Sequence, residues 1–394
     1  MVPKGWMLLQ VSDICKLQNG NSFKPHEWDT KGLPIIRIQN LNGSGNYNYF
    51  SGVPQDKWLV EPGQLLFSWA GTKGVSFGPF IWNGPKGVLN QHIYKVFANE
   101  NVHEHWLYLA LLHITQKIEA QAHGFKSTLL HVQKKDIDNQ FVLTPPVAEQ
   151  KKISQILSTW NKAISVTEKL LANSQQQKKA LIQQLLTGKK RLLDENGVRF
   201  SGEWCTCTLS EVAHIIMGSS PKSEAYNDNG LGLPLIQGNA DIKCRVSCPR
   251  VYTSDITKEC TPGDILLSVR APVGTVALSQ HKACIGRGIS AIKSKRKMSQ
   301  SFLYQWFLWF EPKWCYLSQG STFESINSDD IKTLKLSVPN FEEQQKIAAV
   351  LSAADVEIST LEKKLACLKN EKKALMQQLL TGKRRVKVDE AVAV

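Results

Sequence analysis

The feature that most constrains this chain is a passage that it carries twice. KKALIQQLLTGKKR at residues 178–191 returns as KKALMQQLLTGKRR at residues 372–385, 194 positions later, with two of fourteen letters changed. Extending the match back to Glu149 and Glu343 keeps this offset without a gap, and 24 of 43 positions are identical. An ungapped match of this length indicates a duplication, so we expect two copies of one structural unit.

Apolar residues inside each copy recur at alternating steps of four and three. This spacing is a heptad stripe, which is typical of a helix that packs along its length on another helix. We therefore predict two long helices of about 40 residues, roughly 60 Å each, that form an antiparallel coiled coil. The predicted seam residues, which we also expect to serve partner binding, are Ile153, Leu157, Trp160, Ile164, Leu171, Leu181 and Leu185 in the first copy and Ile347, Leu351, Ile358, Leu365, Leu375 and Leu379 in the second.

The ends of both helices are also indicated by the sequence. Prolines precede each helix, and Asn340 with Glu343 three residues later can form a capping arrangement. Gly188 and Gly382 are placed to end the helices in the left-handed conformation. We interpret the three basic residues after each glycine as favourable charges at the carbonyl end of the helix dipole.

The segments before the helices match each other loosely, for example PGQLLFSWAGTKG at Pro62 and PGDILLSVRAPVG at Pro262. The predicted fold class is α+β, with two similar α/β globules separated by the two helices and related by a pseudo-twofold axis. Antiparallel helices would place the globules at opposite ends and the closing TGKRRVKVDE beside residues 3–6. The predicted domains are a first globule (1–146), a central helix (147–190), a second globule (191–339, with a linker at 191–203), a C-terminal helix (340–386) and a tail (387–394).

Composition favours a protein that binds a polyanion. The 394 residues carry a net charge of +14, and this excess is spread over all segments of the chain. Nine cysteines, an odd number without a secretory signal, predict free thiols, and their spacing does not suggest a zinc site. No apolar run approaches the roughly 20 residues of a membrane span, so we expect a cytoplasmic location.

The sequence lacks the motifs of the enzymes that act on DNA. A DNA amino-methyltransferase needs a glycine loop for adenosylmethionine and an Asn/Asp-Pro-Pro-aromatic motif, whereas the single Pro-Pro here is in TPPV at Thr144. An ATP-driven motor needs GxxxxGK[ST], which TGKK does not provide. We therefore expect no catalytic residues and no bound metal in this chain.

At this point the pattern resembles the specificity (S) subunit of Type I restriction-modification systems. The resemblance is carried by the EQKKI/EQQKI heads and QQLLTGK tails of the helices, the PGDILLSVRAPVG block, and the QGSTFESINSDDI loop that leads into KLSVP. It covers essentially the whole chain. The first globule departs from it, with HGFKSTLLHV and GVLNQHIYKV where the second has QGSTFESINS and GRGISAI.

This resemblance implies a DNA specificity subunit without catalysis of its own. Each globule would be a target-recognition domain that reads one half of an asymmetric, bipartite double-stranded DNA target. The helices would set the spacing and dock two methyltransferase subunits, and restriction subunits would complete the complex. S-adenosylmethionine and ATP with Mg²⁺ would be bound by those partners.

Candidate base contacts follow from the chemistry of base edges, because arginine matches guanine and Asn or Gln matches adenine. Lysines would rather meet phosphates. For each single residue, a solvated or structural role remains the alternative. The candidate DNA-binding residues are Lys24, Arg37, Gln39, Asn40, Lys73, Asn90, Gln91 and Lys126 in the first globule and Lys222, Gln237, Asn239, Arg270, Arg287, Ser321 and Thr322 in the second.

Two alternatives remain open at this stage. A coiled-coil scaffold, or a sequence-specific DNA-binding regulator without restriction-modification partners, would carry similar helices and charge. The aromatic run between Phe302 and Phe310 could stack on bases, but its helical spacing favours core packing.

Overall fold

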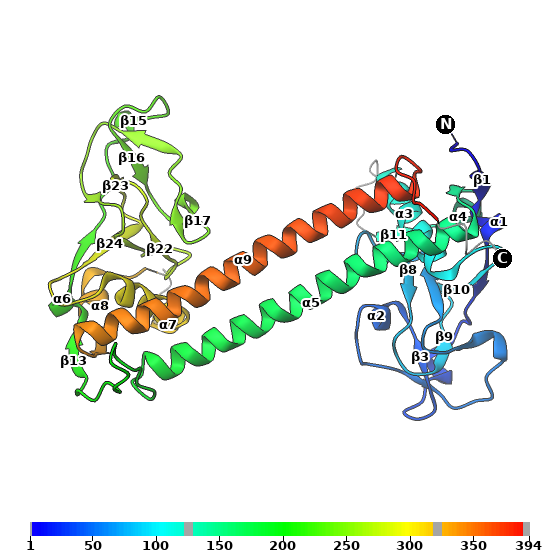
Figure 1. Ribbon diagram of the computed structural model, residues 1–394, viewed down its shortest axis with the longest axis horizontal. Coiled ribbons are helices and arrows are strands. Elements are labelled where there is room, and N and C mark those ends of the chain that lie inside the picture. Colours follow the sequence, from blue (N-terminus) through cyan, green and yellow to red (C-terminus); the bar gives the residue numbers. More distant parts are fainter. Residues whose placement is uncertain (1, 122–128, 318–324, 389–394) are drawn as a thin grey trace. The chain divides into compact units, whose positions relative to one another are not determined.

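The computed structural model describes residues 2–121, 129–317 and 325–388 (Figure 1). The chain divides into two compact units. Unit 1 consists of Met1–Thr167 and Lys364–Val394, and unit 2 consists of Glu168–Lys363. Both predicted long helices are present, as α5 (Val147–Leu185) and α9 (Phe341–Leu380), and each contributes a segment to each unit.

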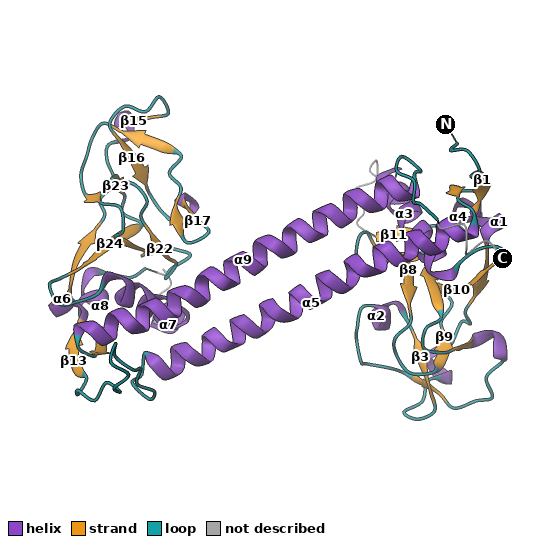
Figure 2. Cartoon of the chain, viewed as in Figure 1, coloured by secondary structure: helices purple, strands orange, loops and turns teal. Residues whose placement is uncertain are grey.

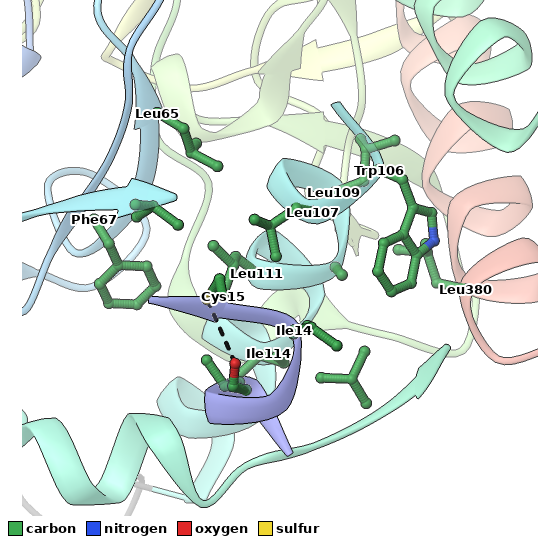
Figure 3. Packing of buried hydrophobic residues seen from close by; sticks show 14 of the residues in the cluster. Ile14, Cys15, Leu65, Phe67, Trp106, Leu107, Leu109, Leu111, Ile114 and Leu380 are labelled. Atoms are coloured by element: carbon green, nitrogen blue, oxygen red, sulfur yellow. Dashed lines mark hydrogen bonds between the residues drawn. The ribbon is translucent and has the colours of Figure 1, made fainter. Parts of the chain in front are cut away.

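In unit 1 the start of α5 lies against the end of α9. Ile153 and Leu157 share one buried apolar cluster with Met376, Leu379 and Leu380. The same cluster continues into the first globule, where Figure 3 shows Leu380 near the ring of Trp106. Burial of such side chains stabilises the unit by about 1.5–3 kcal/mol each.

In unit 2 the end of α5 lies against the start of α9, because Leu185 shares a cluster with Ile347 and Leu351. The two helices therefore run antiparallel in both units, as predicted. The predicted domain limits treated the helices as separate segments. The compact units differ from those limits because the helix ends are part of the globule cores.

The first globule contains two four-stranded sheets (Figure 2). One is ordered β2 (Cys15–Asn19), β10 (Ile93–Ala98), β6 (Leu65–Ser68) and β8 (Gly78–Ile81), and the other β4 (Tyr49–Phe50), β3 (Leu33–Ile36), β9 (Gly87–Leu89) and β5 (Leu59–Val60). Short pairs join β1 (Met7–Gln10) to β12 (Phe141–Thr144) and β7 (Ala70–Thr72) to β11 (Leu129–His131). The helices are α1 (Val11–Ile14), α2 (Ile38–Leu41), α3 (Glu104–Gln121), α4 (Lys134–Asp138), η1 (Pro25–Glu27) and η2 (Asp56–Trp58).

The second globule repeats this plan with larger sheets. One is ordered β14 (Ala213–Met217), β24 (Ile289–Ser294), β21 (Ile265–Ser268), β22 (Val276–Leu278), β18 (Val246–Ser247) and β17 (Ile242–Lys243). The other is ordered β15 (Tyr226–Asn227), β19 (Val251–Thr253), β16 (Leu233–Ile236), β23 (Ala283–Ile285) and β20 (Glu259–Cys260), and β13 (Cys205–Thr208) pairs with β25 (Lys335–Val338). The helices are α6 (Leu209–Val212), α7 (Gln300–Leu317), α8 (Ser328–Lys332), η4 (Ser223–Ala225) and η5 (Asn239–Asp241).

The aromatic run of α7 packs in the core of unit 2, as its helical spacing predicted. Phe302 and Phe307 are fully buried, and Trp306 stacks on Phe310 with ring centres 5.0 Å apart. Stacking of this run on bases is therefore excluded for its buried members. Among the described residues, no helix is long and apolar enough to cross a membrane.

The helix caps follow the prediction in part. Gly188 and Gly382 adopt φ of 68° and 67°, the left-handed region that favours glycine. At the start of α9 the Asn340 side chain accepts a hydrogen bond from the Glu343 amide at 2.9 Å. The Glu343 carboxylate does not complete the capping arrangement, because it binds an arginine instead.

That arginine is Arg191, the last of the basic residues interpreted as charges at the helix end. In unit 2 it donates from Nε (2.7 Å) and Nη2 (2.6 Å) to Glu343, and its guanidinium lies 5.9 Å from the centre of the Trp204 ring. The interpretation is therefore corrected for Arg191. A fully buried carboxylate requires a paired cation, which is a stronger constraint than the helix dipole.

Unit 1 contains the equivalent arrangement at Arg385. Its Nε donates to Glu149 at 3.0 Å, its Nη1 donates to the Lys4 carbonyl at 2.9 Å, and its guanidinium lies 5.5 Å from the centre of the Trp6 ring. The closing segment therefore lies beside residues 3–6, as predicted. We call these two arrangements the arginine clamps of units 1 and 2.

Candidate nucleic-acid interface

Three loops meet at the same place in each globule. In unit 1 the parallel strands β3 and β9 end side by side, and the amide of Asn90 donates to the Ile36 carbonyl at 3.0 Å. The amide of Trp69, after β6, donates to the His92 carbonyl at 3.3 Å. Residues 37–40, 68–72 and 90–92 thus come together, and we call them loop cluster 1.

Unit 2 builds loop cluster 2 with the same backbone contacts. It comprises residues 237–239, 268–270 and 286–288, which follow the parallel strands β16 and β23 and the strand β21. Gly286 donates to the Ile236 carbonyl at 2.9 Å, and Val269 donates to the Gly288 carbonyl at 2.9 Å. Loops at the carboxyl ends of parallel strands are common positions for binding residues.

Loop cluster 2 presents two unpaired arginines. Arg270 and Arg287 are exposed, and their guanidinium groups make no hydrogen bond or ion pair with the described chain. Such a planar fork of donors matches the O6 and N7 acceptors of guanine in the major groove. The structure thus brings two of the predicted base-contacting arginines into one cluster.

Gln237 belongs to the same cluster because Gly288 lets the loop after β23 come close to the loop after β16. A Cβ at Gly288 would lie 2.4 Å from the Gln237 carbonyl oxygen, which no side chain can tolerate. The Gln237 side chain is exposed, and the backbone amide of Gln237 donates to Asp241 Oδ2 at 2.9 Å. Asp241, which pairs with Arg250 at 2.9 Å, was not predicted from the sequence and is a positioning residue for this loop.

Asn239 also belongs to loop cluster 2, whereas two other predicted residues of the second globule lie outside the described residues. Asn239 begins η5 and is half-buried. The backbone of Ser325 pairs with that of Arg270 in an isolated antiparallel β-bridge. Ser321 and Thr322, like Lys126 in the first globule, lie outside the described residues.

Loop cluster 1 differs at the position after β3. Arg37 is half-buried, its guanidinium lies 5.2 Å from the centre of the Trp28 ring, and its buried Nε has no hydrogen-bond partner among the described residues. Gln39 is exposed and donates to the Asn46 carbonyl at 3.0 Å. These two predicted residues remain accessible at the edge of the cluster.

Asn40 has a different role from the predicted one. Its side chain is 4% exposed, accepts from the Arg37 amide at 2.9 Å and donates to the carbonyls of Ser44 and Asn46, each at 3.0 Å. These bonds occupy both ends of the amide, so the geometry assigns Asn40 to holding the loop. Sequence reasoning could not distinguish this role, because an Asn that closes a turn and an Asn that reads adenine are both polar loop residues.

Loop cluster 1 also contains an aromatic patch that sequence reasoning missed. The Trp69 ring lies 4.6 Å from that of His131 and 5.0 Å from that of His92, and it stacks on Tyr94 at 6.1 Å. Burial, followed by the nearby His131, lowers the pKa of His92. The members of the patch come from three separate segments, so no local motif announces them.

Asn90 and Gln91 lie next to this patch. Both are half-buried, and the Trp69 Nε1 donates to the Gln91 carbonyl at 3.1 Å. The Gln91 amide nitrogen lies 3.3 Å from His92 Nε2, so the ring fixes the orientation of the glutamine. Both residues therefore belong to loop cluster 1, and their contact with bases stays a prediction.

The candidate phosphate-binding lysines occupy matching places in the two globules. Lys24 and Lys222 directly precede η1 and η4, and both are exposed. Lys73 follows β7 and is half-buried, with an interaction to the rest of the protein. Exposed ammonium groups are suited to contacts with a DNA backbone, which position a protein without reading a base.

The predicted seam residues pack inside the chain. All thirteen are buried or half-buried. Ile153, Leu157, Leu375 and Leu379 belong to the apolar cluster of unit 1, and Leu181, Leu185, Ile347 and Leu351 belong to that of unit 2. Large apolar side chains that are exposed on these helices are Val166 and Leu170 on α5 and Phe341, Val350 and Val356 on α9. The expected role of the seam residues in partner binding stays a prediction.

Comparison with known proteins gives a consistent result. The family model "Type I restriction modification DNA specificity domain" matches residues 3–173 and residues 201–370, one copy per repeat. The "Putative type I restriction enzyme MjaX specificity subunit" of Methanocaldococcus jannaschii is 32% identical over 410 residues, covering 98% of this chain and 95% of that protein.

Two solved structures share the fold. A chain from a structure described as "Structural basis underlying complex assembly and conformational transition of the type I R-M system" aligns with a TM-score of 0.63 and 24% identity, covering 98% of this chain and all of that one. The Type-I restriction-modification system S subunit from M. genitalium aligns with a TM-score of 0.62 and 16% identity, covering 96% of each chain. With two matched specificity domains that span most of its length, the chain belongs to the Type I restriction-modification DNA specificity family.

Proposed function

We propose that this specificity subunit reads a bipartite DNA target, with loop cluster 1 on one half-site and loop cluster 2 on the other. The supporting observation is that the two clusters share their backbone contacts and differ in their side chains. One offers Gln91 beside an aromatic patch, and the other offers Arg270 and Arg287. Different donors and acceptors on one scaffold select different bases, so the two half-sites are unlike each other.

The long helices act as a spacer and as a docking surface for two methyltransferase subunits in this proposal. A helix of 39 or 40 residues at 1.5 Å per residue extends roughly 60 Å, which exceeds the roughly 34 Å of one DNA turn. The two half-sites are then separated by bases that the protein does not read. Repeated helix surfaces are suited to binding two copies of one partner.

The chain itself is proposed to be non-catalytic and cytoplasmic. Its sequence lacks the adenosylmethionine loop, the Asn/Asp-Pro-Pro-aromatic motif and the phosphate-binding motif described above. S-adenosylmethionine would be bound by the methyltransferase subunits, and ATP with Mg²⁺ by the restriction subunits. This chain would supply only the choice of sequence.

Methylome sequencing tests this proposal directly. A host without other DNA methyltransferases would express this chain together with its cognate methyltransferase subunit. We expect methylation at a split, asymmetric motif with an unread spacer. A continuous motif or a perfect palindrome would contradict the proposal.

A matched pair of variants assigns the half-sites. Arg287→Ala should relax one half of the motif and leave the other half unchanged, whereas Gln91→Ala should do the reverse. Lys346→Ala on α9, which also removes one polar side chain but lies outside both clusters, serves as the control and should leave both halves unchanged. If either cluster variant altered both halves equally, the assignment of one half-site to each cluster would be wrong.

A further inference from the structure

The duplicated helices carry the same lysine at equivalent positions, but its surroundings differ between the units. In unit 2, Lys178 on α5 forms an ion pair with Asp355 on α9. Asp355 also accepts a hydrogen bond from Gln305 Nε2 at 2.8 Å, and Glu357 accepts one from Ser174 Oγ at 3.0 Å. The helix seam of unit 2 therefore neutralises its own lysine.

Unit 1 lacks every partner in that network. The 194-residue offset places Lys372 at the position of Lys178, and Asn161 and Ala163 at the positions of Asp355 and Glu357. In the matched helices α3 and α7, Leu109 stands where unit 2 has Gln305. Lys372 makes no hydrogen bond or ion pair with the described residues of the chain.

Lys372 faces a groove in unit 1 of about 290 Å³. The groove lies between α3, α5 and α9, and none of its lining residues is acidic: they are Leu112, Gln116, Asn161, Ile164, Lys369, Lys372, Lys373 and Met376. Burial lowers the pKa of Lys372, which means that the surroundings disfavour its charged form. A carboxylate placed in the groove would restore the partner that unit 2 supplies internally.

We propose that this groove receives an acidic side chain of the methyltransferase subunit that docks at unit 1. The inference rests on the proposed function and deepens it, because it makes the two docking positions unequal. At unit 2 the equivalent lysine is already paired with Asp355, so the second methyltransferase subunit lacks this contact and binds more weakly. The small volume and the apolar walls of Leu112, Ile164 and Met376 fit one protein side chain better than a duplex backbone.

The test uses the full chain and its cognate methyltransferase subunit. Sedimentation velocity titrations would give the two stepwise dissociation constants. For the wild type we expect two unequal constants. Asn161→Asp places in unit 1 the acid that unit 2 has at the equivalent position, so Lys372 becomes paired internally. We expect it to weaken the tighter step about tenfold, which corresponds to roughly 1.4 kcal/mol.

Two further variants separate this effect from misfolding and from general charge. Lys372→Gln removes the groove cation and should weaken the same step to a similar degree. Lys31→Gln removes an exposed lysine of the first globule, outside the docking helices and outside the groove, and should leave both constants unchanged. Unfolding midpoints in urea would show that all three variants remain folded.

Each outcome bears on one claim. If the wild type binds no methyltransferase subunit at all, the proposed function itself is wrong. If the wild type binds two subunits but Asn161→Asp and Lys372→Gln leave both constants unchanged, the groove is not the contact. If Lys372→Gln weakens salt-dependent DNA binding and leaves the methyltransferase constants unchanged, the groove is a phosphate site and the inference is overturned.

Discussion

Loop clusters 1 and 2 are built with the same backbone hydrogen bonds, yet they share almost no side chains. Where the first has Trp69 and His92, the second has Val269 and Gly288. The strands beneath them keep the same parallel pairing, Ile35 with Val88 and Leu235 with Cys284. The difference shows that the scaffold holds loop positions through main-chain contacts, which leaves the side chains free to diverge.

The helices show the opposite behaviour, because their packing depends on side chains. Apart from Trp160, whose counterpart is Ala354, the predicted seam residues and the two arginine clamps are repeated with the same residue types. Divergence there would cost stability in both units. The following predictions test how far the two units are equivalent, from the largest expected effect to the smallest.

Replacing the clamp arginines should have the largest effect and should separate the units. Arg191→Met leaves the Glu343 carboxylate buried without a cation, and such losses cost about 3–5 kcal/mol. Arg385→Met should cost less, because the Arg385 side chain is 41% exposed and the Trp6 indole still donates to Glu149. Hydrogen-exchange mass spectrometry, which reports on each unit separately, would measure the loss of stability in each of the two variants. Equal losses in the two variants would contradict this ranking.

Asn40 and Asn239 occupy comparable loops but should respond differently. Asn40→Ala removes three hydrogen bonds and should cost about 3 kcal/mol of stability in unit 1, at about 1 kcal/mol for each bond. Asn239→Ala should leave the stability of unit 2 nearly unchanged. Urea denaturation would measure the free energy of unfolding of the two variants. If Asn40→Ala were as stable as the wild type, Asn40 would again be a candidate for a base contact.

The two arginines of loop cluster 2 should contribute to DNA affinity and not to stability. Arg270→Ala or Arg287→Ala should weaken binding to the second half-site by about 1–3 kcal/mol each. Fluorescence anisotropy with duplexes altered in one half-site at a time would measure this loss in the assembled complex. A loss that is the same for every duplex would indicate phosphate contacts instead of base reading.

Acidification should have the smallest effect and should fall on unit 1. Burial lowers the pKa values of His92, His105 and His113, so the unfolded chain binds protons there more readily than the folded chain. The stability of unit 1 should therefore decrease as the pH falls below the ordinary histidine pKa of about 6.5. Unit 2 has Gly288, Ser301 and Trp309 at the matched positions. His113→Gln should reduce the pH dependence of hydrogen exchange in unit 1, and an unchanged dependence would contradict this explanation.

The sequence predicted the helices well because their signals are local and repeated. A heptad stripe and a glycine at the C-terminus each depend on residues within one or two turns. The clamps were missed because Glu149 and Arg385 are 236 residues apart, and the ion pair forms only after the chain has folded. The aromatic patch was missed for the same reason, since Trp69 and His131 meet through strand pairing between β7 and β11.

Candidate base contacts were predicted only in part. The sequence identified the loops, because apolar strands break there into polar residues beside glycine. It could not predict that the Asn40 side chain is bound to neighbouring carbonyls while the guanidinium groups of Arg270 and Arg287 have no hydrogen-bond or ion-pair partner among the described residues. That distinction depends on the turn geometry of each loop.

Unit 1 is built from two separate stretches of the chain, and this has a consequence for its folding during translation. Its core includes Leu379 and Leu380, and its clamp requires Arg385, yet the whole of unit 2 is one uninterrupted stretch, Glu168–Lys363. The ribosome therefore completes the synthesis of unit 2 before it synthesises the second stretch of unit 1, Lys364–Val394. The domain translated first must wait, incompletely folded, for the domain translated second.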